Sequence, residues 1–170
     1  MAQERWLNEN QQRFWRLYVD VQHHLERVLH RELLAESGLS SAEFAVLVPL
    51  SETPAEKLRA RDLCRELGWD RTRLSHLVTR MQQRGLVRRS ACADDARGSV
   101  VELTDEGRRA ITDAAPAHTD AVRRYLIDLL DDDEISTMTD VFQRVLKGLD
   151  PQPNKGCGTT IAVSPRYHPG

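Results

Sequence analysis

The stretch LRARDLCRELGWDRTRLSHLVTRMQQRGLVRRSACADDARGSVVEL, residues 58–103, decides the fold. Leucines at helical spacing and two glycines predict a short helix over 58–68, a tight turn, and a second helix over 70–84. A basic hairpin is predicted over 86–103. Two helices joined by a turn and followed by a hairpin are typical of a winged helix-turn-helix.

The positive charge of the chain is concentrated in this stretch. From Arg59 to Arg97 there are ten arginines and five Asp or Glu residues, a net charge of +5. Because the whole chain has a formal charge of −2, the other residues sum to −7. An Arg-rich helix face can also be a solvated surface, but the turn, the preceding helix and the basic hairpin together favour contact with DNA phosphates.

The second helix of the motif has an apolar face and a polar face. Its apolar residues follow i, i+3, i+4, i+7 spacing: Leu74, Leu77, Val78 and Met81. The polar side chains between them are the candidate DNA contacts: Arg71, Thr72, Arg73, Ser75, His76, Thr79 and Arg80. Arginine can donate to O6 and N7 of guanine, and Ser or Thr reaches a phosphate or a base edge. The N-terminal residues of such a helix enter the major groove first, which favours the first four.

The hairpin supplies further candidate contacts. Its strands are expected over 86–90 and 99–104, and it carries three arginines: Arg88, Arg89 and Arg97. We select Arg88 and Arg97 as DNA contacts, because Arg97 lies near the tip and narrow minor grooves attract arginine. Asp95 is expected to pair with Arg97 or to hold the loop, and so to stabilise the wing.

A long amphipathic helix precedes this motif, over residues 8–34, and Ser37-Gly38 ends it. One apolar stripe is Phe14, Leu17, Val21, Leu25 and Val28, and a second is Trp15, Tyr18 and Leu29. A helix that is apolar on two sides packs between two neighbours, and one of them can be a second copy of the chain. A core helix should follow, with Ser40 or Ser41 as its N-cap and Glu43 near the capping-box position.

Two prolines fall inside predicted helices. Pro49 should end or distort the core helix, because proline removes a backbone donor and clashes with the preceding turn. Pro116 should kink or divide the helix expected over 106–130. A last helix should follow the acidic residues 131–134 and end at Gly148. Residues 151–170 have the composition of a disordered tail.

The composition narrows the class of protein. The 170 residues are 40% hydrophobic and 5% aromatic, which fits one compact domain with a Leu, Val, Ile and Ala core. No apolar run approaches the roughly 20 residues of a membrane span, and the polar N-terminus is unlike a signal peptide. We therefore expect a cytoplasmic protein that does not bind membranes. The three cysteines, Cys64, Cys92 and Cys157, form neither a disulfide framework nor a C-x-x-C metal motif.

Residues 68–89, GWDRTRLSHLVTRMQQRGLVRR, resemble the recognition helix and first wing strand of the MarR family of bacterial transcriptional regulators. A second set of residues resembles the wing signature of that family: Asp95-Ala96-Arg97-Gly98, Val100, Val101, Leu103-Thr104 and Gly107. The order of elements agrees with the family over roughly residues 5–148.

The resemblance implies a mainly α fold with a small β wing, within a MarR-like domain of residues 1–150. The winged helix-turn-helix would cover about 40–104, flanked by dimerisation helices over about 5–35 and 105–148. A homodimer would hold its two recognition helices about 34 Å apart on a palindromic double-stranded DNA site. The family also implies a repressor that a small aromatic or phenolic effector releases, bound between the dimer lobe and the DNA-binding lobe.

Several smaller signals leave alternatives open. Trp15 and Tyr18 are candidates for a ligand pocket, although core or dimer packing is the preferred interpretation. The histidines near Glu26 on the first helix lack an H-E-x-x-H pattern, so solvated or interface histidines are preferred to a metal site. Cys64 and Cys92 leave open a thiol-based redox-sensing regulator.

An interaction module and an enzyme are the remaining alternatives. A winged-helix module that binds protein instead of DNA is the rival from another class, and the Arg-rich helix face argues against it. We find no nucleophile and base at a meaningful spacing, no P-loop and no dinucleotide fingerprint. We therefore expect neither an enzyme nor a cofactor.

Overall fold

The computed structural model describes residues 6–92 and 95–149, with the side chains of 92 and 95–97 left out. Its helices are α1 (Glu9–Ser37), α2 (Ser41–Glu52), α3 (Ala60–Leu67), α4 (Arg71–Gln83), α5 (Asp105–Tyr125) and α6 (Asp132–Leu149). Its strands are β1 (Lys57–Arg59), β2 (Val87–Cys92) and β3 (Asp95–Leu103), and a 3-10 turn, η1 (Ile127–Leu129), precedes α6. The predicted class, mainly α with a small β wing, is confirmed.

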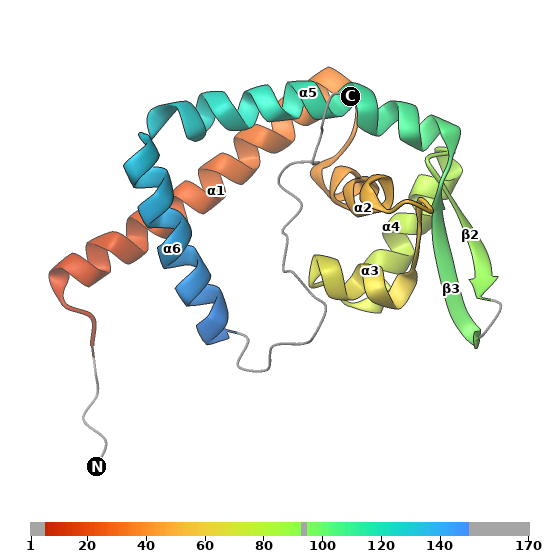
Figure 1. Cartoon of the computed structure of the whole chain (residues 1–170), viewed down its shortest axis with the longest axis horizontal. Coiled ribbons are helices and arrows are strands. Elements are labelled where there is room, and N and C mark those ends of the chain that lie inside the picture. The colour runs from red at the N-terminus through yellow and green to blue at the C-terminus, as the bar shows by residue number, and fades with distance from the viewer. Residues whose placement is uncertain (1–5, 93–94, 150–170) are drawn as a thin grey trace, which may run out of the picture.

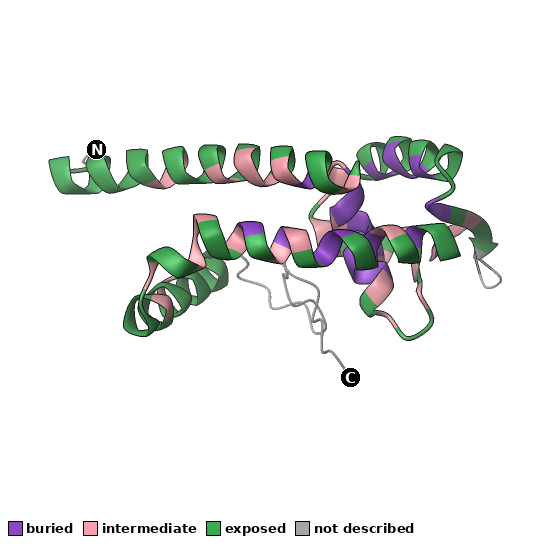
Figure 2. Cartoon of the chain, turned by 90° about the horizontal axis from the view of Figure 1, so that it is seen from above, coloured by how far each residue is buried: buried purple, intermediate pink, exposed green. Residues whose placement is uncertain are grey.

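The elements form two lobes joined by the long helices (Figure 1). α5 runs along the top of the molecule beside α1 and connects the lobe of α2, α3, α4 and the sheet to α6 at the opposite end. Buried residues gather in the first of these lobes, whereas α1 and α6 are largely exposed (Figure 2). Among the described helices, none is by itself long and apolar enough to cross a membrane, and α1 with α2 passes only as a pair bent by 75°.

The core lies in the winged helix-turn-helix lobe and is aliphatic, as the composition predicts. α2 is at its centre, since every residue from Val46 to Leu50 is buried. Further fully buried side chains come from the surrounding elements: Leu63, Leu74, Val78, Met81 and Val101. Burial of each such side chain contributes about 1.5–3 kcal/mol, so apolar burial holds this lobe together.

The sheet contains a strand that the sequence analysis missed. β1 pairs antiparallel with β3, with Leu58 opposite Val101, and the strand order is β1-β3-β2. The helix predicted from residue 58 therefore begins at Ala60. A strand of three residues with a single apolar side chain shows no periodicity, so only its pairing with β3 defines it.

The wing strands are longer than predicted. β2 continues to Cys92 and β3 begins at Asp95, so the backbone expected as a loop is largely strand. Cross-strand pairing carries the ladder to Ala91 opposite Ser99, beyond the apolar residues that marked the strands in the sequence. A register irregularity between Ala91 and Cys92 then adjusts the pairing near the tip.

Neither proline divides its helix. α2 passes through the buried Pro49 and ends at Glu52, less than one turn later, which agrees with a helix end near the proline. The core packing of α2 outweighs the single lost backbone bond so near its end, where Thr53 Oγ1 donates to the Pro49 carbonyl at 2.8 Å. α5 also continues through Pro116, and the helical segment is interrupted only at Leu126, before η1.

The predicted caps explain where the helices begin and turn. Ser40 and Glu43 form a capping box at the start of α2, as expected. Gly38 ends α1 with a φ of 67°, a left-handed conformation that glycine adopts without strain. The acidic start of α6 is confirmed at Asp132, whereas residues 151–170, predicted to be a disordered tail, lie outside the described residues.

Candidate nucleic-acid interface

The polar face of α4 is exposed along its whole length. Its four apolar residues are buried in the core, as predicted: Leu74, Leu77, Val78 and Met81. All seven candidate contacts on this helix are exposed: Arg71, Thr72, Arg73, Ser75, His76, Thr79 and Arg80. Thr79 Oγ1 donates to the Ser75 carbonyl at 2.9 Å, so its hydroxyl is oriented along the helix. The arrangement presents short polar and basic side chains on an anchored helix.

The turn between α3 and α4 sets where α4 starts. Gly68 ends α3 with a φ of 64°, and the Trp69 N–H donates to the Cys64 carbonyl at 2.9 Å. Asp70 then caps α4 by accepting from the Arg73 N–H at 2.9 Å. That backbone hydrogen bond is the main reason why the pKa of Asp70 lies below its ordinary value. The ionised carboxylate partly neutralises the helix N-terminus, which leaves anion binding there to the arginines.

Trp69 positions one of the candidate arginines. The Arg73 guanidinium carbon lies 4.1 Å from the centroid of the Trp69 ring, a cation–π contact. The Trp69 ring is itself half-buried against the hydrophobic core, so it is a firm support. In the sequence, Trp69 stands out only as part of the family segment, because an i, i+4 spacing does not by itself reveal a stacking contact.

The two arginines of β2 lie on opposite faces of the strand. Arg88 lies opposite Glu102 in the register, and its Nη2 donates to Glu102 Oε1 at 2.6 Å. This hydrogen bond raises the pKa of Arg88 and lowers the pKa of Glu102. Arg89 points the other way, toward α3 and α4, because successive strand residues alternate between faces. Arg88, which we selected from the sequence, is therefore held by a cross-strand ion pair.

A basic groove lies between α3, α4 and the wing. It has a volume of about 430 Å³, and its charged lining residues are Arg59, Arg61, Arg71 and Arg89. Ser75 and Ser99 add hydroxyl groups to the lining. The Arg89 Nε atom is buried and has no hydrogen-bond partner among the described residues. Arginines and hydroxyl groups in such a lining can bind an anion. Arg59 and Arg61 were not among the predicted DNA contacts; in the sequence they contributed only to the count of positive charge in this stretch.

Cys64 lies in the same groove but is buried. Burial raises the pKa of the Cys64 thiol, and the nearby Asp70 raises it further against the opposing effect of Arg71. A raised pKa disfavours the reactive thiolate. The redox-sensing alternative stays a prediction without support from this thiol, and the Cys92 side chain lies outside the described residues.

Two predicted wing residues belong to the strand β3. Asp95 and Arg97 belong to β3, so their backbone is part of the wing, but their side chains lie outside the described residues. The minor-groove role of Arg97 and the stabilising role of Asp95 stay predictions.

Trp15 and Tyr18 lie on α1, with ring centroids 5.7 Å apart, far along the chain from the basic groove.

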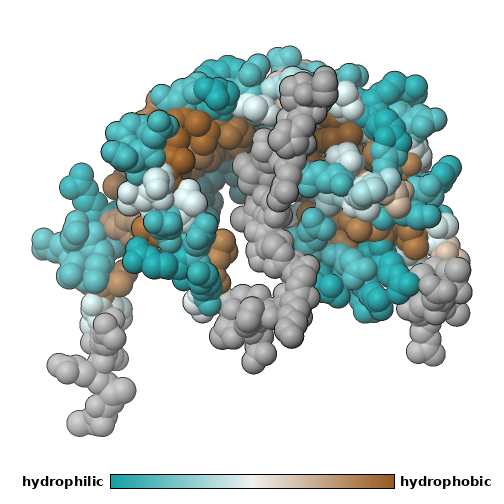
Figure 3. Space-filling model, in the orientation of Figure 1, coloured by the Kyte–Doolittle hydropathy of each residue, from teal (hydrophilic) through white to brown (hydrophobic). Residues whose placement is uncertain are grey.

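Apolar side chains remain exposed on the arm made by α1 and α6. On α1 they are Phe14, Trp15, Leu17, Val21 and Leu34, and on α6 they are Met138, Phe142, Val145, Leu146 and Leu149. None of the residues of α6 is buried. Figure 3 shows apolar surface under α5, on the side of the molecule that carries α1 and α6. Within the described residues, this surface has no partner in the single chain.

The fold and the surface together define a winged helix-turn-helix protein in which the polar face of α4 lies beside a basic groove. The sequence model of the MarR family matches residues 37–98. BadR of Rhodopseudomonas palustris, a transcriptional activatory protein, is 33% identical over 138 residues, which cover 81% of this chain and 76% of BadR.

Two solved structures extend the likeness. Sco3205, a MarR family transcriptional regulator from Streptomyces coelicolor in complex with DNA, is 35% identical with a TM-score of 0.84, covering 91% of this chain and 96% of that one. CouR from Rhodococcus jostii RHA1, bound to p-coumaroyl-CoA, is 28% identical with a TM-score of 0.64, covering 76% and 88%. The chain belongs to the MarR family of transcriptional regulators, which confirms the resemblance found in its sequence.

Proposed function

We propose that two copies of this DNA-binding regulator place their α4 helices in successive major grooves of a palindromic duplex. The observation that carries the proposal is the exposed polar face of α4, bordered by the basic groove. Thr72, Arg73, Ser75, His76 and Thr79 are exposed and would meet base edges. Sco3205, of which this chain covers 96%, is a relative in complex with DNA.

The basic groove is the site that we assign to a phosphate of the DNA backbone. Arg71 and Arg89 line it from α4 and from β2, so one phosphate would bridge helix and wing. The buried Arg89 Nε, which has no partner among the described residues, would donate to that phosphate. Arg88 would contribute mainly by holding Glu102, and Arg97 would reach the minor groove.

The homodimer is proposed from the apolar arm. Side chains such as Phe142 and Val145 on α6, together with Phe14 on α1, are exposed in the single chain. A second copy would cover them with its own α1 and α6 in an isologous interface. Trp15 and Tyr18 would then lie near the junction of the two copies, where packing remains preferred to a ligand pocket.

Response to an effector and the direction of regulation are further proposals. CouR is bound to p-coumaroyl-CoA, which supports an aromatic or phenolic effector for this chain as well. Repression stays a prediction from the family resemblance, and BadR is a transcriptional activatory protein. A reporter fused to the bound promoter, measured with and without this gene, decides the sign. Since the target is bacterial DNA, we place the protein in the cytoplasm.

The salt dependence of binding tests the proposed function. We would measure the affinity of the full chain for DNA upstream of its own gene over a range of salt concentrations. Because bound arginines release counterions, log affinity should fall against log salt with a slope of about −0.9 per phosphate contact. Arg71→Ala and Arg89→Ala should each flatten the slope by about one contact, whereas Arg109→Gln, on α5, should not. Absence of binding at low salt would favour the protein-interaction module.

A further inference from the structure

A buried carboxylate and one arginine connect the ends of three helices. Glu43 belongs to the first turn of α2 and is 6% exposed. Its Oε2 accepts from the Ser40 backbone N–H at 2.9 Å and from the Ser40 hydroxyl at 2.8 Å. Its Oε1 accepts from Arg84 Nη1 at 2.7 Å. Arg84 is the C-cap residue of α4, the proposed recognition helix, so the carboxylate joins the start of α2 to the end of α4.

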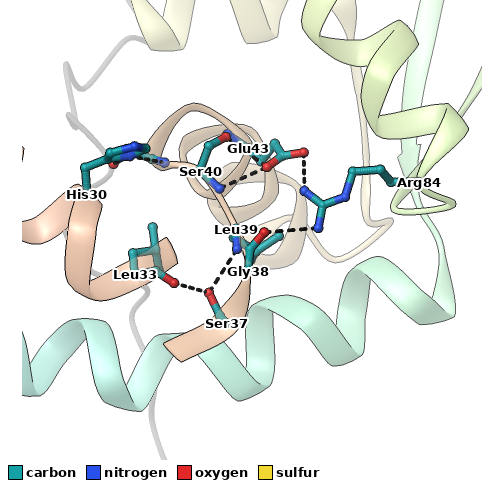
Figure 4. A network of polar contacts seen from close by, with 9 residues as sticks. His30, Leu33, Ser37, Gly38, Leu39, Ser40, Glu43 and Arg84 are labelled. Atoms are coloured by element: carbon teal, nitrogen blue, oxygen red, sulfur yellow. Dashed lines mark hydrogen bonds and ion pairs between the residues drawn. The ribbon is translucent and has the colours of Figure 1, made fainter. Parts of the chain in front are cut away.

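The same arginine reaches α1. Arg84 Nη2 donates to the Gly38 carbonyl at 3.1 Å, and Gly38 is the C-cap residue of α1. The turn that presents this carbonyl is held by Ser37, whose hydroxyl donates to the Leu33 carbonyl at 2.7 Å. Figure 4 shows the guanidinium lying between the Glu43 carboxylate and the Gly38 carbonyl. One side chain therefore links α4 both to α2 and to the apolar arm.

Charge strengthens this junction. Burial raises the pKa of the Glu43 carboxyl, but hydrogen bonds from Ser40 and Arg84 outweigh burial, and the pKa lies below its ordinary value. The carboxylate is thus ionised where it meets Arg84. Charge-assisted hydrogen bonds are directional, whereas apolar burial is not. The core packing of α4 is therefore supplemented by two directional bonds at its C-terminal end.

We propose that Arg84 and Glu43 are positioning residues that fix the angle between the recognition helix α4 and helix α1 of the arm. They thereby determine which half-site spacing the dimer accepts. This inference rests on the proposed function. Thr104 Oγ1 donates to the Gly85 and Leu86 carbonyls at 2.6 and 2.9 Å, which ties the same turn to α5. Loss of the Arg84 bonds therefore leaves a pivot at the end of α4 without detaching the helix.

A small pivot has a large effect at the far end of α4. The helix has 13 residues and is about 20 Å long, at about 1.5 Å per residue. Because α4 is packed in the core, the winged helix-turn-helix lobe would turn as a whole, and a turn of about 10° around this junction moves the N-terminal end of α4 by about 3.5 Å, close to the rise of one base pair. Four of the seven candidate contacts, Arg71, Thr72, Arg73 and Ser75, lie in this N-terminal part of α4. Loss of the Arg84 bonds would therefore weaken the preference of the dimer for one half-site spacing, without changing which bases each helix contacts.

The experiment compares half-site spacings with the full chain. Duplexes selected from a random pool by the wild-type protein define a half-site, and copies of it are then placed at centre-to-centre separations around about 10 base pairs, one base pair apart. Affinity is measured for the wild type, Glu43→Gln and Arg84→Gln. We expect the preference for the best spacing over its neighbours to fall by about three- to tenfold in both variants. The cost of a single base change within a half-site should stay the same.

Matched variants separate positioning from general damage. Arg109→Gln and Glu106→Gln remove the partners of an exposed ion pair on α5 with the same changes of charge, and should keep the wild-type preference. Arg84→Lys keeps the charge and one bond, so it should restore part of the preference. Because Glu43 also caps α2, its variant can lose the fold; Arg84→Gln, at a half-exposed side chain, then carries the test.

The outcomes distinguish this inference from the function on which it rests. A wild-type spacing optimum that both variants retain would overturn the inference alone, as would a parallel loss of affinity at all spacings. A wild type with no spacing optimum would overturn the homodimeric reading of DNA, and the inference with it. An additive loss in the double variant Glu43→Gln/Arg84→Gln would also count against a shared junction.

Discussion

The two lobes of this molecule treat their apolar residues in opposite ways. The winged helix-turn-helix buries its own, with Leu47, Leu63 and Val101 fully inside. The arm of α1 and α6 exposes residues as large as Phe14 and Phe142. The first lobe has a buried core within one chain, whereas the second leaves apolar surface exposed, which the proposed dimer would cover. The residues that form the core and the residues proposed to form the dimer therefore lie in separate parts of the sequence.

The largest expected effect is a cavity in the winged helix-turn-helix lobe. Leu63→Ala, at a fully buried position of α3, should lower the free energy of unfolding by about 2–5 kcal/mol. Urea denaturation at two protein concentrations measures it, and the loss should be the same at both. Leu146→Ala on α6, where the side chain is exposed, is the matched control; its effect should depend on protein concentration. Equal, concentration-independent losses would remove the contrast between the lobes.

The next largest effect is expected on dimerisation through the arm made by α1 and α6. Phe142→Lys, which places a charge on the apolar face of α6, should weaken dimerisation by about 30-fold or more, because a hot-spot contact is lost and a charge is buried. Sedimentation equilibrium measures this change, and operator affinity should fall with it. Gln143→Lys adds the same charge at an exposed neighbouring position and should leave the dimer intact. A wild-type chain that sediments as a monomer would contradict the proposed interface.

A smaller effect is expected at the edge of the reading helix. Arg73→Ala should lower specific affinity by about 1–3 kcal/mol if the guanidinium contacts a base. Trp69→Leu, which removes the stacking partner at 4.1 Å, should cost about 1 kcal/mol of the same affinity. In the double variant the Trp69 effect should vanish, because its target is absent. Additive losses would show that Trp69 acts through the core and not through Arg73.

The smallest expected effect is an acid dependence at the junction between the lobes. The pKa of Glu43 is lowered in the folded chain from an ordinary value of 4.5. Its ionised form therefore contributes stability above that value, and the contribution is lost as the pH falls through the lowered pKa. The difference in unfolding free energy between the wild type and Glu43→Gln should shrink on acidification, since protonated Glu resembles Gln. A constant difference across pH would contradict this assignment.

Local sequence patterns predicted most of the winged helix-turn-helix lobe. The apolar spacing and the caps of α4 place all seven candidate contacts on its exposed face, because a single helix determines which side of itself is apolar. β1 escaped notice, since three residues without periodicity acquire strand structure only through β3. Pro49 indicated only that α2 ends nearby; how far the helix continues past it, to Glu52, depends on the packing of the whole core.

The sequence by itself determined the winged helix-turn-helix order, the concentration of arginine in one lobe and the membership of a family, all of which are written in neighbouring residues. Tertiary structure decided which arginines act together. Arg84 meets Glu43 across 41 positions of sequence, and Arg59 and Arg89 share one groove. No periodicity records such pairs, because the distance between two side chains depends on how every helix between them packs.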